Sequence, residues 1–152
     1  LYVNSILAKT EATLAGFDEA IILNQDGHVC EGSGENIFMV AEGRLVTPVL
    51  QDNALPGITR DTVIQLARSE LGLEVVERSI NRSELYLADE VFLTGTAAHL
   101  TPVSELDSRS IGDGNPGPVS TRLRKMYFDI VAGRNPKYLH WCTAAAPRLV
   151  TV

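Results

Sequence analysis

Apolar and polar positions along the chain predict a mixture of strands and helices. Short apolar runs bounded by turn residues predict strands over residues 19–23, 28–31, 36–40, 44–47, 73–76, 90–93 and 100–106. An apolar repeat of about 3.6 residues predicts helices over 5–15, 58–71 and 119–131, with a short helical turn at 85–88. Because most of these strands follow one another as hairpins, the pattern favours the α+β class.

The helix over 58–71 has the most regular pattern, and Gly72 is placed to end it. For the first helix we expect Asn4 as the cap and Gly16 as the stop, with Ile6 and Leu14 on one apolar face. Asn81 and Glu84 have the spacing of a capping box before the short turn.

Turn residues also set the boundaries of the chain's loops. Residues 25–27 and 41–43 predict hairpin turns, and the glycine- and proline-rich stretch 112–118 predicts a loop. No internal repeat is visible. We expect one domain over 1–142 and a flexible tail over 143–152.

Composition narrows the class of protein. The 152 residues are enough for one domain with a core, and a net charge of −6 argues against a nucleic-acid or anionic-membrane surface. No apolar run is long enough to span a bilayer, and we expect neither a signal peptide nor a metal site. Cys30 and Cys142 are expected to be free thiols of a cytoplasmic protein.

Three stretches carry candidate chemistry. The first, residues 30–38, places Glu31 and two glycines between apolar strands; considered alone, it is more typical of a hairpin with a charged turn. The second, residues 55–61, has the sequence Leu-Pro-Gly-Ile-Thr-Arg-Asp and opens the helix over 58–71. The third, residues 94–98, has the sequence Thr-Gly-Thr-Ala-Ala and follows an apolar strand.

Together the three stretches resemble the cofactor cradle of fold-type IV pyridoxal-phosphate enzymes, and most closely that of the branched-chain amino acid aminotransferases. The resemblance implies the large C-terminal domain of that fold, with a mixed or antiparallel sheet curled into a pseudobarrel and flanked by helices. It also implies pyridoxal 5'-phosphate as the cofactor. The family's first domain has no counterpart in this sequence.

The first stretch matches the family's motif S/C-E-G-x-G-E-N residue for residue. By this resemblance Glu31 lies beside the ring nitrogen of the cofactor. A negative charge there raises the pKa of that nitrogen and keeps it protonated, so that the ring accepts electrons. The glycines leave room for a flat ring.

The second stretch contains the family's L-P-G-I-T-R motif. Ile58 and Thr59 lie in the first turn of a helix, where free N–H groups and the helix dipole favour a phosphate. Gly57 permits a close approach, and by resemblance Leu55 packs on the ring. Considered alone, Thr59 is better explained as a cap of its own helix.

In the third stretch Thr96 adds a hydroxyl, and by resemblance it binds the phosphate. The amides near Ala97 and Ala98 are expected to hold the substrate carboxylate, although a turn of small residues is the alternative. His99 is interpreted as structural. By resemblance, the Tyr2 hydroxyl bonds the phenolic oxygen of the cofactor.

The family's Schiff-base lysine precedes the tyrosine that matches Tyr2, so we expect it before Leu1. Lys9 has the wrong spacing and is interpreted as a solvated helix residue, and Lys125 and Lys137 lie far from the motifs. No residue of this sequence is therefore assigned as catalytic. The start at Leu1 favours a fragment of a longer protein.

The leading interpretation is the cofactor-binding half of an enzyme that moves the amino group of leucine, isoleucine or valine to 2-oxoglutarate. The expected partners are amino acid and 2-oxo acid substrates, the first domain and a second copy of the chain. One alternative is a stand-alone binding or assembly module without catalysis. Others are a D-amino acid aminotransferase or an aminodeoxychorismate lyase, although the run Gly34-Glu35-Asn36 favours the branched-chain group.

Overall fold

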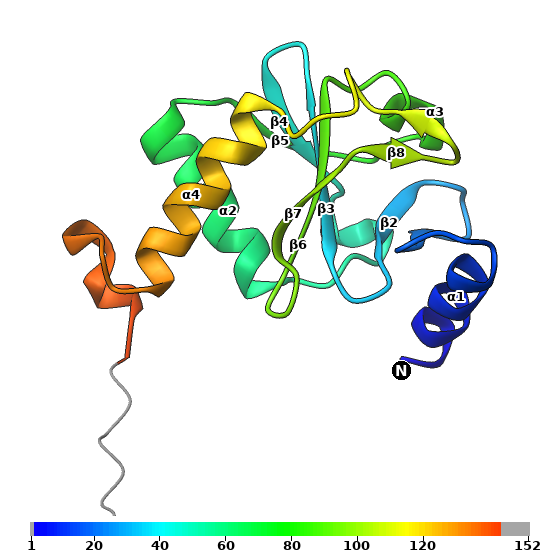
Figure 1. The fold of residues 1–152 in the computed structure, drawn as a ribbon, viewed down its shortest axis with the longest axis horizontal. Helices are drawn as coiled ribbons and strands as arrows, with labels where there is room; N and C mark the ends of the chain where they lie inside the picture. The colour runs from blue at the N-terminus through cyan, green and yellow to red at the C-terminus, as the bar shows by residue number, and fades with distance from the viewer. Residues whose placement is uncertain (1, 144–152) are drawn as a thin grey trace, which may run out of the picture.

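A computed structural model describes residues 2–143 of the chain. Its centre is a five-stranded mixed sheet (Figure 1) with the strand order β5-β4-β3-β6-β7. The bounds of these strands, from one edge to the other, are β5 Val75–Glu77, β4 Arg44–Thr47, β3 Asn36–Ala41, β6 Glu90–Gly95 and β7 His99–Val103. The predicted α+β class is confirmed, and the expected tail lies, except for Thr143, outside the described residues.

Each face of the sheet has its own apolar core. Alternate residues of β3 and β6, including Phe38 and Phe92, face the helices α2 (Ile58–Leu71) and α4 (Pro118–Val131), which cover one side (Figure 1). The two phenyl rings stack with their centroids 5.2 Å apart. The other residues of these strands, such as Ile37 and Leu93, pack against the strand β2 (Val29–Gly32) and the short helix α3 (Arg82–Leu85).

One pair of strands in this sheet is parallel. β4 and β5 run in the same direction and are joined through α2, so that the chain makes a β4–α2–β5 crossover. The remaining neighbours in the sheet pair antiparallel. α2 has the predicted bounds, and Gly72 takes the left-handed conformation, with φ +62°, that ends it.

The first helix differs from its prediction. α1 spans Val3–Leu14 and its hydrogen bonding starts at Tyr2, whose carbonyl accepts from the amide of Ile6 at 2.8 Å. Asn4 therefore lies in the first turn and is not the cap. None of the helix's residues is buried, and Ile6 and Leu14 are 60% and 84% exposed. Gly16, with φ +90°, follows its end as expected.

The strands and turns around the sheet follow the predicted order with shifted bounds. β1 (Ile21–Leu23) and β2 (Val29–Gly32) form a two-stranded sheet. The predicted strand over 100–106 divides into β7 and β8, because β8 (Glu105–Leu106) pairs with β9 (Arg109–Ser110). The turns η1 (Leu50–Asp52) and η2 (Pro136–Trp141) were not predicted.

The capping box predicted at Asn81 and Glu84 is present, although its helix α3 spans Arg82–Leu85, earlier than the predicted 85–88. The strand predicted over 73–76 is β5, shifted toward the C-terminus. Over residues 2–143, no helix has the length and apolar character required to cross a membrane.

A buried carboxylate anchors α4 to the sheet. Glu90, the first residue of β6, accepts hydrogen bonds from the amides of Val119 and Ser120, both at 2.8 Å. A Cβ atom on Gly117 would lie only 2.0 Å from the carboxyl carbon of Glu90, so any other residue at this position would displace the buried carboxylate. The negative charge of Glu90 also lies at the positive end of the α4 helix dipole, which is a stabilising interaction.

We expect Glu90→Gln to lower the free energy of unfolding by about 1–3 kcal/mol, because an amide can accept from only one of the two N–H groups. Urea unfolding would measure the change. Glu105→Gln on the exposed strand β8 is the control, with an expected change below about 0.5 kcal/mol. Equal effects of the two substitutions would contradict the capping role.

Candidate functional site

The three sequence motifs meet in one open pocket with a volume of about 650 Å³. Seven predicted site residues line it together with Ala97, whereas Ala98 does not reach it. The full lining is Tyr2, Ser5, Glu31, Ser33, Gly34, Glu35, Asn36, Leu55, Pro56, Gly57, Ile58, Thr59, Thr94, Gly95, Thr96 and Ala97. Its size is ordinary for a site that binds a small molecule or cofactor.

Glu31 is a half-buried carboxylate on the wall of the pocket. It lies on β2, where the pairing of Glu31 with Ile22 holds the backbone. One of its oxygens, Oε2, accepts a hydrogen bond from the Leu55 amide at 2.8 Å. A carboxylate has two oxygens, so Oε1 remains as an acceptor for a ligand.

The backbone of Leu55 is held from both sides. While Glu31 accepts from its amide, the side-chain amide of Asn36 donates to its carbonyl at 2.7 Å. The Leu55 side chain is 61% exposed and lines the pocket. These two bonds join β2, β3 and the loop that leads into α2.

The N-terminus of α2 opens onto the pocket. Gly57 is the N-cap residue and makes no side-chain capping bond, so the amides of the first turn are available to an anion. A Cβ atom on Gly57 would lie 2.2 Å from Oδ1 of Asn36. The closeness of helix and sheet therefore depends on this glycine. Thr59 is buried beside it, and the Ile58 side chain is exposed.

Arg60 fixes α2 against the sheet behind the pocket. Its buried guanidinium donates to the carbonyl of Pro48 at 3.0 Å and to the carboxylate of Glu77 at 2.8 Å. Pro48 directly follows β4 and Glu77 ends β5. The arginine of the second motif is therefore a structural anchor that holds the start of α2 in place.

The third motif forms the loop of the β6–β7 hairpin. Gly95 pairs with His99, so Thr96, Ala97 and Ala98 form a three-residue connection. A Cβ atom on Gly95 would lie 3.2 Å from the carbonyl oxygen of Gly34, which brings this hairpin against the first motif. The His99 ring packs on Phe128 of α4, with the centroids 5.2 Å apart.

Tyr2 and Ser5 reach the pocket from the first turns of α1. Lys9, expected to be solvated, is half-buried: its amine donates to the carbonyl of Asp18 and to the Glu19 carboxylate, the latter at 2.7 Å. Burial acts to raise the pKa of Glu19, but its hydrogen bonds from Lys9 and Ser33 outweigh this and lower that pKa. The pair links α1 to the segment before β1.

Asn36, Thr94 and Glu35 were not predicted as site residues. Asn36 and Thr94 are the polar residues at neighbouring ends of β3 and β6, where they pair in register. Both are buried. The sequence contained a signal for these two residues, because each is a polar residue at the end of an apolar strand, which is where a binding residue can be expected. Glu35 was visible as the second glutamate of the first motif, and its carboxylate accepts from the Gly34 amide at 3.0 Å.

Cys30 lies next to Glu31 and is buried. Burial, together with the negative charges of Glu31 and Asp52, raises the pKa of its thiol to about 11. The thiol is therefore protonated at neutral pH and is not a nucleophile.

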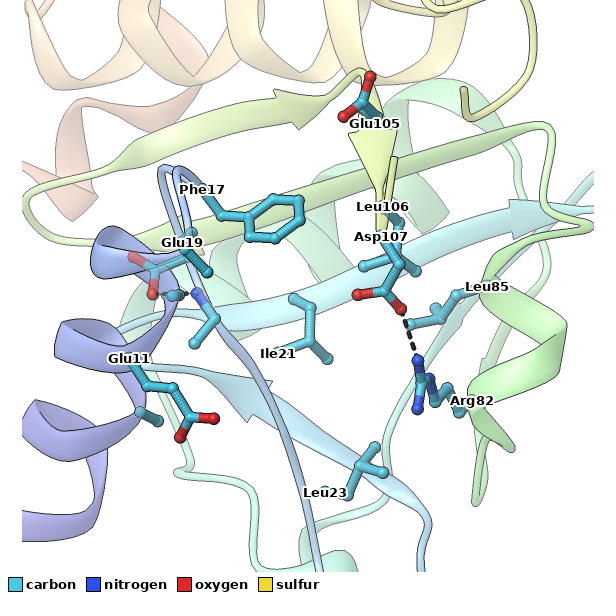
Figure 2. A pocket seen from close by; sticks show the side chains of 14 residues that line it. Glu11, Phe17, Glu19, Ile21, Leu23, Arg82, Leu85, Glu105, Leu106 and Asp107 are labelled. Carbon is cyan, nitrogen blue, oxygen red and sulfur yellow. Dashed lines mark hydrogen bonds and ion pairs between the residues drawn. The ribbon is translucent and has the colours of Figure 1, made fainter. Parts of the chain in front are cut away.

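A second pocket of about 390 Å³ contains none of the three motifs (Figure 2). Phe17, Ile21 and Leu85 point into it, and Arg82 and Asp107 form an ion pair at 2.7 Å on its wall. Hydrogen bonds from Tyr86 and Arg82 lower the pKa of Asp107, so its charge is already compensated. The residues of the three motifs line the other pocket, of about 650 Å³, which we call the motif pocket.

A family model and two curated relatives all match this chain to aminotransferases. The amino-transferase class IV family matches residues 1–106. A probable branched-chain-amino-acid aminotransferase of Aquifex aeolicus is 56% identical over 142 residues, which are 93% of this chain and 46% of that protein. The branched-chain-amino-acid aminotransferase of Escherichia coli K12 is 46% identical over 140 residues, which are 92% of this chain and 45% of that protein.

Solved structures have the same fold. The branched-chain amino acid aminotransferase of Thermobaculum terrenum, in its PLP form, superposes with a TM-score of 0.91 at 48% identity, covering 93% of this chain and 46% of that one. The branched-chain aminotransferase of the thermophilic archaeon Thermoproteus uzoniensis, solved with norvaline, gives a TM-score of 0.89 at 51% identity, with 93% and 46% covered. The chain thus spans about half the length of the relatives it matches.

We expect Gly57→Ala to lower the free energy of unfolding by about 1–3 kcal/mol, since the added methyl collides with Asn36. In an Asn36→Ala background the same substitution should cost less than about 1 kcal/mol, which a double-mutant cycle in urea would measure. Gly34→Ala, whose Cβ would meet open space, is the control. Equal costs of Gly57→Ala in the two backgrounds would show that the collision is not what excludes alanine.

Proposed function

Because the chain belongs to the amino-transferase class IV family, we propose that it is the pyridoxal-phosphate-binding portion of a branched-chain amino acid aminotransferase. One observation supports this most strongly: Glu31, the open end of α2 and the β6–β7 loop line the same pocket. The activity is that of a longer protein, since the chain spans about half of its relatives. We assign residues 1–142 to its cofactor-binding domain.

Two features of the pocket support this cofactor: a carboxylate, Glu31, lies on its wall, and the uncapped N-terminus of α2 opens onto the same space. When bound, the cofactor supplies a protonated pyridine ring that accepts electrons as an amino acid loses its α-proton. Oε1 of Glu31 holds the proton at the ring nitrogen, since a carboxylate stabilises the cationic form. Leu55 packs on the ring face, and the Tyr2 hydroxyl bonds its phenolic oxygen.

The phosphate would be held at the N-terminus of α2, where Gly57 leaves room and the capping position carries no side-chain bond. The amides of Ile58 and Thr59 would donate to it, and the Thr59 and Thr96 hydroxyls would complete its contacts. The substrate carboxylate would be held at the β6–β7 loop by the amides near Thr96 and Ala97, which line the pocket, whereas Ala98, expected from the sequence to contribute, does not line it.

We further infer that the substrates are leucine, isoleucine and valine, with 2-oxoglutarate as the acceptor. The names of the relatives support this choice, and a similar branched-chain amino acid aminotransferase was solved in complex with 4-methylvaleric acid, a branched aliphatic acid. The relatives named above favour neither the lyase nor the D-amino acid alternative. We place the protein in the cytoplasm as a homo-oligomer; exposed Ile6, Leu7 and Leu14 on α1 offer apolar surface for assembly.

The lysine that attaches the cofactor lies, in this proposal, before Leu1. All three lysines of the sequence lie within the described residues, and their amines contact acidic groups elsewhere: Lys9 with Glu19, Lys125 with Asp129 and Lys137 with Glu70. None lines the motif pocket.

The proposal is tested by incubating the full-length protein with pyridoxal 5'-phosphate, reducing it with borohydride and measuring its mass. We expect one adduct, which peptide mapping places on a lysine before Leu1. A lysine-to-alanine variant at that position is the control and should give none. An adduct on Lys9, Lys125 or Lys137, or no specific adduct, would refute the assignment.

We expect Glu31→Gln in the full-length protein to lower the turnover of leucine at least about 100-fold, because a neutral amide cannot hold the ring nitrogen protonated. Cofactor affinity should fall less than tenfold, since the glutamine oxygen still accepts from Leu55. Steady-state kinetics and a cofactor titration would measure the two effects.

Glu35→Gln removes the same charge from the same pocket and is the matched control. We expect it to retain at least about ten times the turnover of Glu31→Gln. Equal losses in the two variants would mean that the net charge of the pocket, and not the contact of Glu31 with the ring, determines the rate.

A further inference from the structure

Thr94 is a buried polar residue with no partner for its side chain. It is the fifth residue of β6, and its exposed fraction is 1%. Within the described part of the chain its hydroxyl oxygen is shielded and makes no hydrogen bond. Thr47 on β4 is a useful contrast, because it is equally buried but donates to the carbonyl of Ile37 at 2.8 Å.

Two other buried side chains in the described residues have a polar atom without a partner, but each is bonded through another atom. Asp52 accepts from Asn24 at 3.2 Å through its second oxygen, and Arg60 donates through a terminal nitrogen. The hydroxyl of Thr94 is its only polar side-chain atom. Such a group costs stability, and valine would fill the same space in a strand without that cost.

The position of Thr94 relates it to the open end of α2. It pairs in register with Asn36, and the two share the face of the sheet that α2 covers. Asn36 in turn touches the start of α2 at Gly57. Thr94 also lines the motif pocket. A shielded hydroxyl and a helix end with available amides therefore lie together.

We propose that the Thr94 hydroxyl is a ligand-binding group, which donates a hydrogen bond to the phosphate-bearing end of the molecule held at the N-terminus of α2. This inference rests on the proposed function for the identity of that molecule. The bound anion gives Thr94 the partner that residues 2–143 do not provide. Thr94 thus joins Thr59 and Thr96 as a third hydroxyl at this end of the pocket.

The test compares Thr94→Val and Thr94→Ser with the parent protein, using the full-length protein. Without ligand, Thr94→Val should raise the melting temperature by roughly 2–6 °C, because it removes a buried group without a partner. Its dissociation constant for pyridoxal 5'-phosphate should rise about tenfold or more, since a hydrogen bond to an anion is lost. Thr94→Ser should bind within about threefold of the parent, because it keeps the hydroxyl.

Two controls separate the ligand role from a structural one. Thr47→Val removes a hydroxyl that has a partner, so it should lower the melting temperature and leave the affinity for the cofactor unchanged. Binding of pyridoxal, which lacks the phosphate, should be the same in Thr94→Val and the parent. Inorganic phosphate should bind more weakly to Thr94→Val.

Three results would overturn the proposal. The first is that Thr94→Val binds pyridoxal 5'-phosphate and inorganic phosphate as tightly as the parent does. The second is that this variant melts at a lower temperature than the parent without ligand. The third is that it loses affinity for pyridoxal by the same factor as for pyridoxal 5'-phosphate. If the parent protein binds inorganic phosphate but not pyridoxal 5'-phosphate, the proposed function fails, and inorganic phosphate alone then decides the role of Thr94. A parent that binds neither refutes both.

Discussion

The arrangement of the site depends on how the backbone of one residue is held. Leu55 donates through its amide to Glu31 and accepts through its carbonyl from Asn36, at 2.8 and 2.7 Å. Gly57, the N-cap residue of α2, follows only two positions later. The two bonds therefore set the distance between the carboxylate on β2 and the open end of the helix. A ligand with a cationic ring at one end and an anion at the other requires this distance to be constant.

The N-termini of the two long helices on one face of the sheet, α2 and α4, differ in whether a carboxylate of the protein accepts hydrogen bonds from their first turn. Both are preceded by a glycine without a side-chain cap. At α4 the protein supplies its own anion, because Glu90 accepts from two amides of the first turn. At α2 no carboxylate of the described residues makes such bonds, and Gly57 and Thr59 border a pocket instead. The same local structure thus stabilises the fold in one place and leaves helix amides open to a pocket in the other.

The elements that depend on local signals were predictable from the sequence, and those that depend on distant contacts were not. α2 has the predicted bounds because Gly57, the apolar repeat and Gly72 lie within one continuous stretch. The capping role of Glu90 joins residues 29 positions apart, and the bond from Asn36 to Leu55 spans 19 positions. No pattern of short period reveals such pairs. For the same reason the motifs predicted Glu31 and Thr59 as site residues, whereas Asn36 and Thr94, which line the same pocket, were not predicted.

The β4–β5 pair, the one parallel pair of strands in residues 2–143, has a consequence for how the protein can change during evolution. The β4–α2–β5 crossover places the start of α2 at the sheet end where β3 begins and β6 ends. Doubly wound nucleotide-binding proteins place their phosphate site by the same geometry, although their sheets are largely parallel. Side chains around the pocket can be exchanged one at a time, whereas the helix end moves only if the order of the strands changes. As these sequences diverge, we therefore expect the β4–α2–β5 connection to be retained longer than any individual side-chain contact in the pocket.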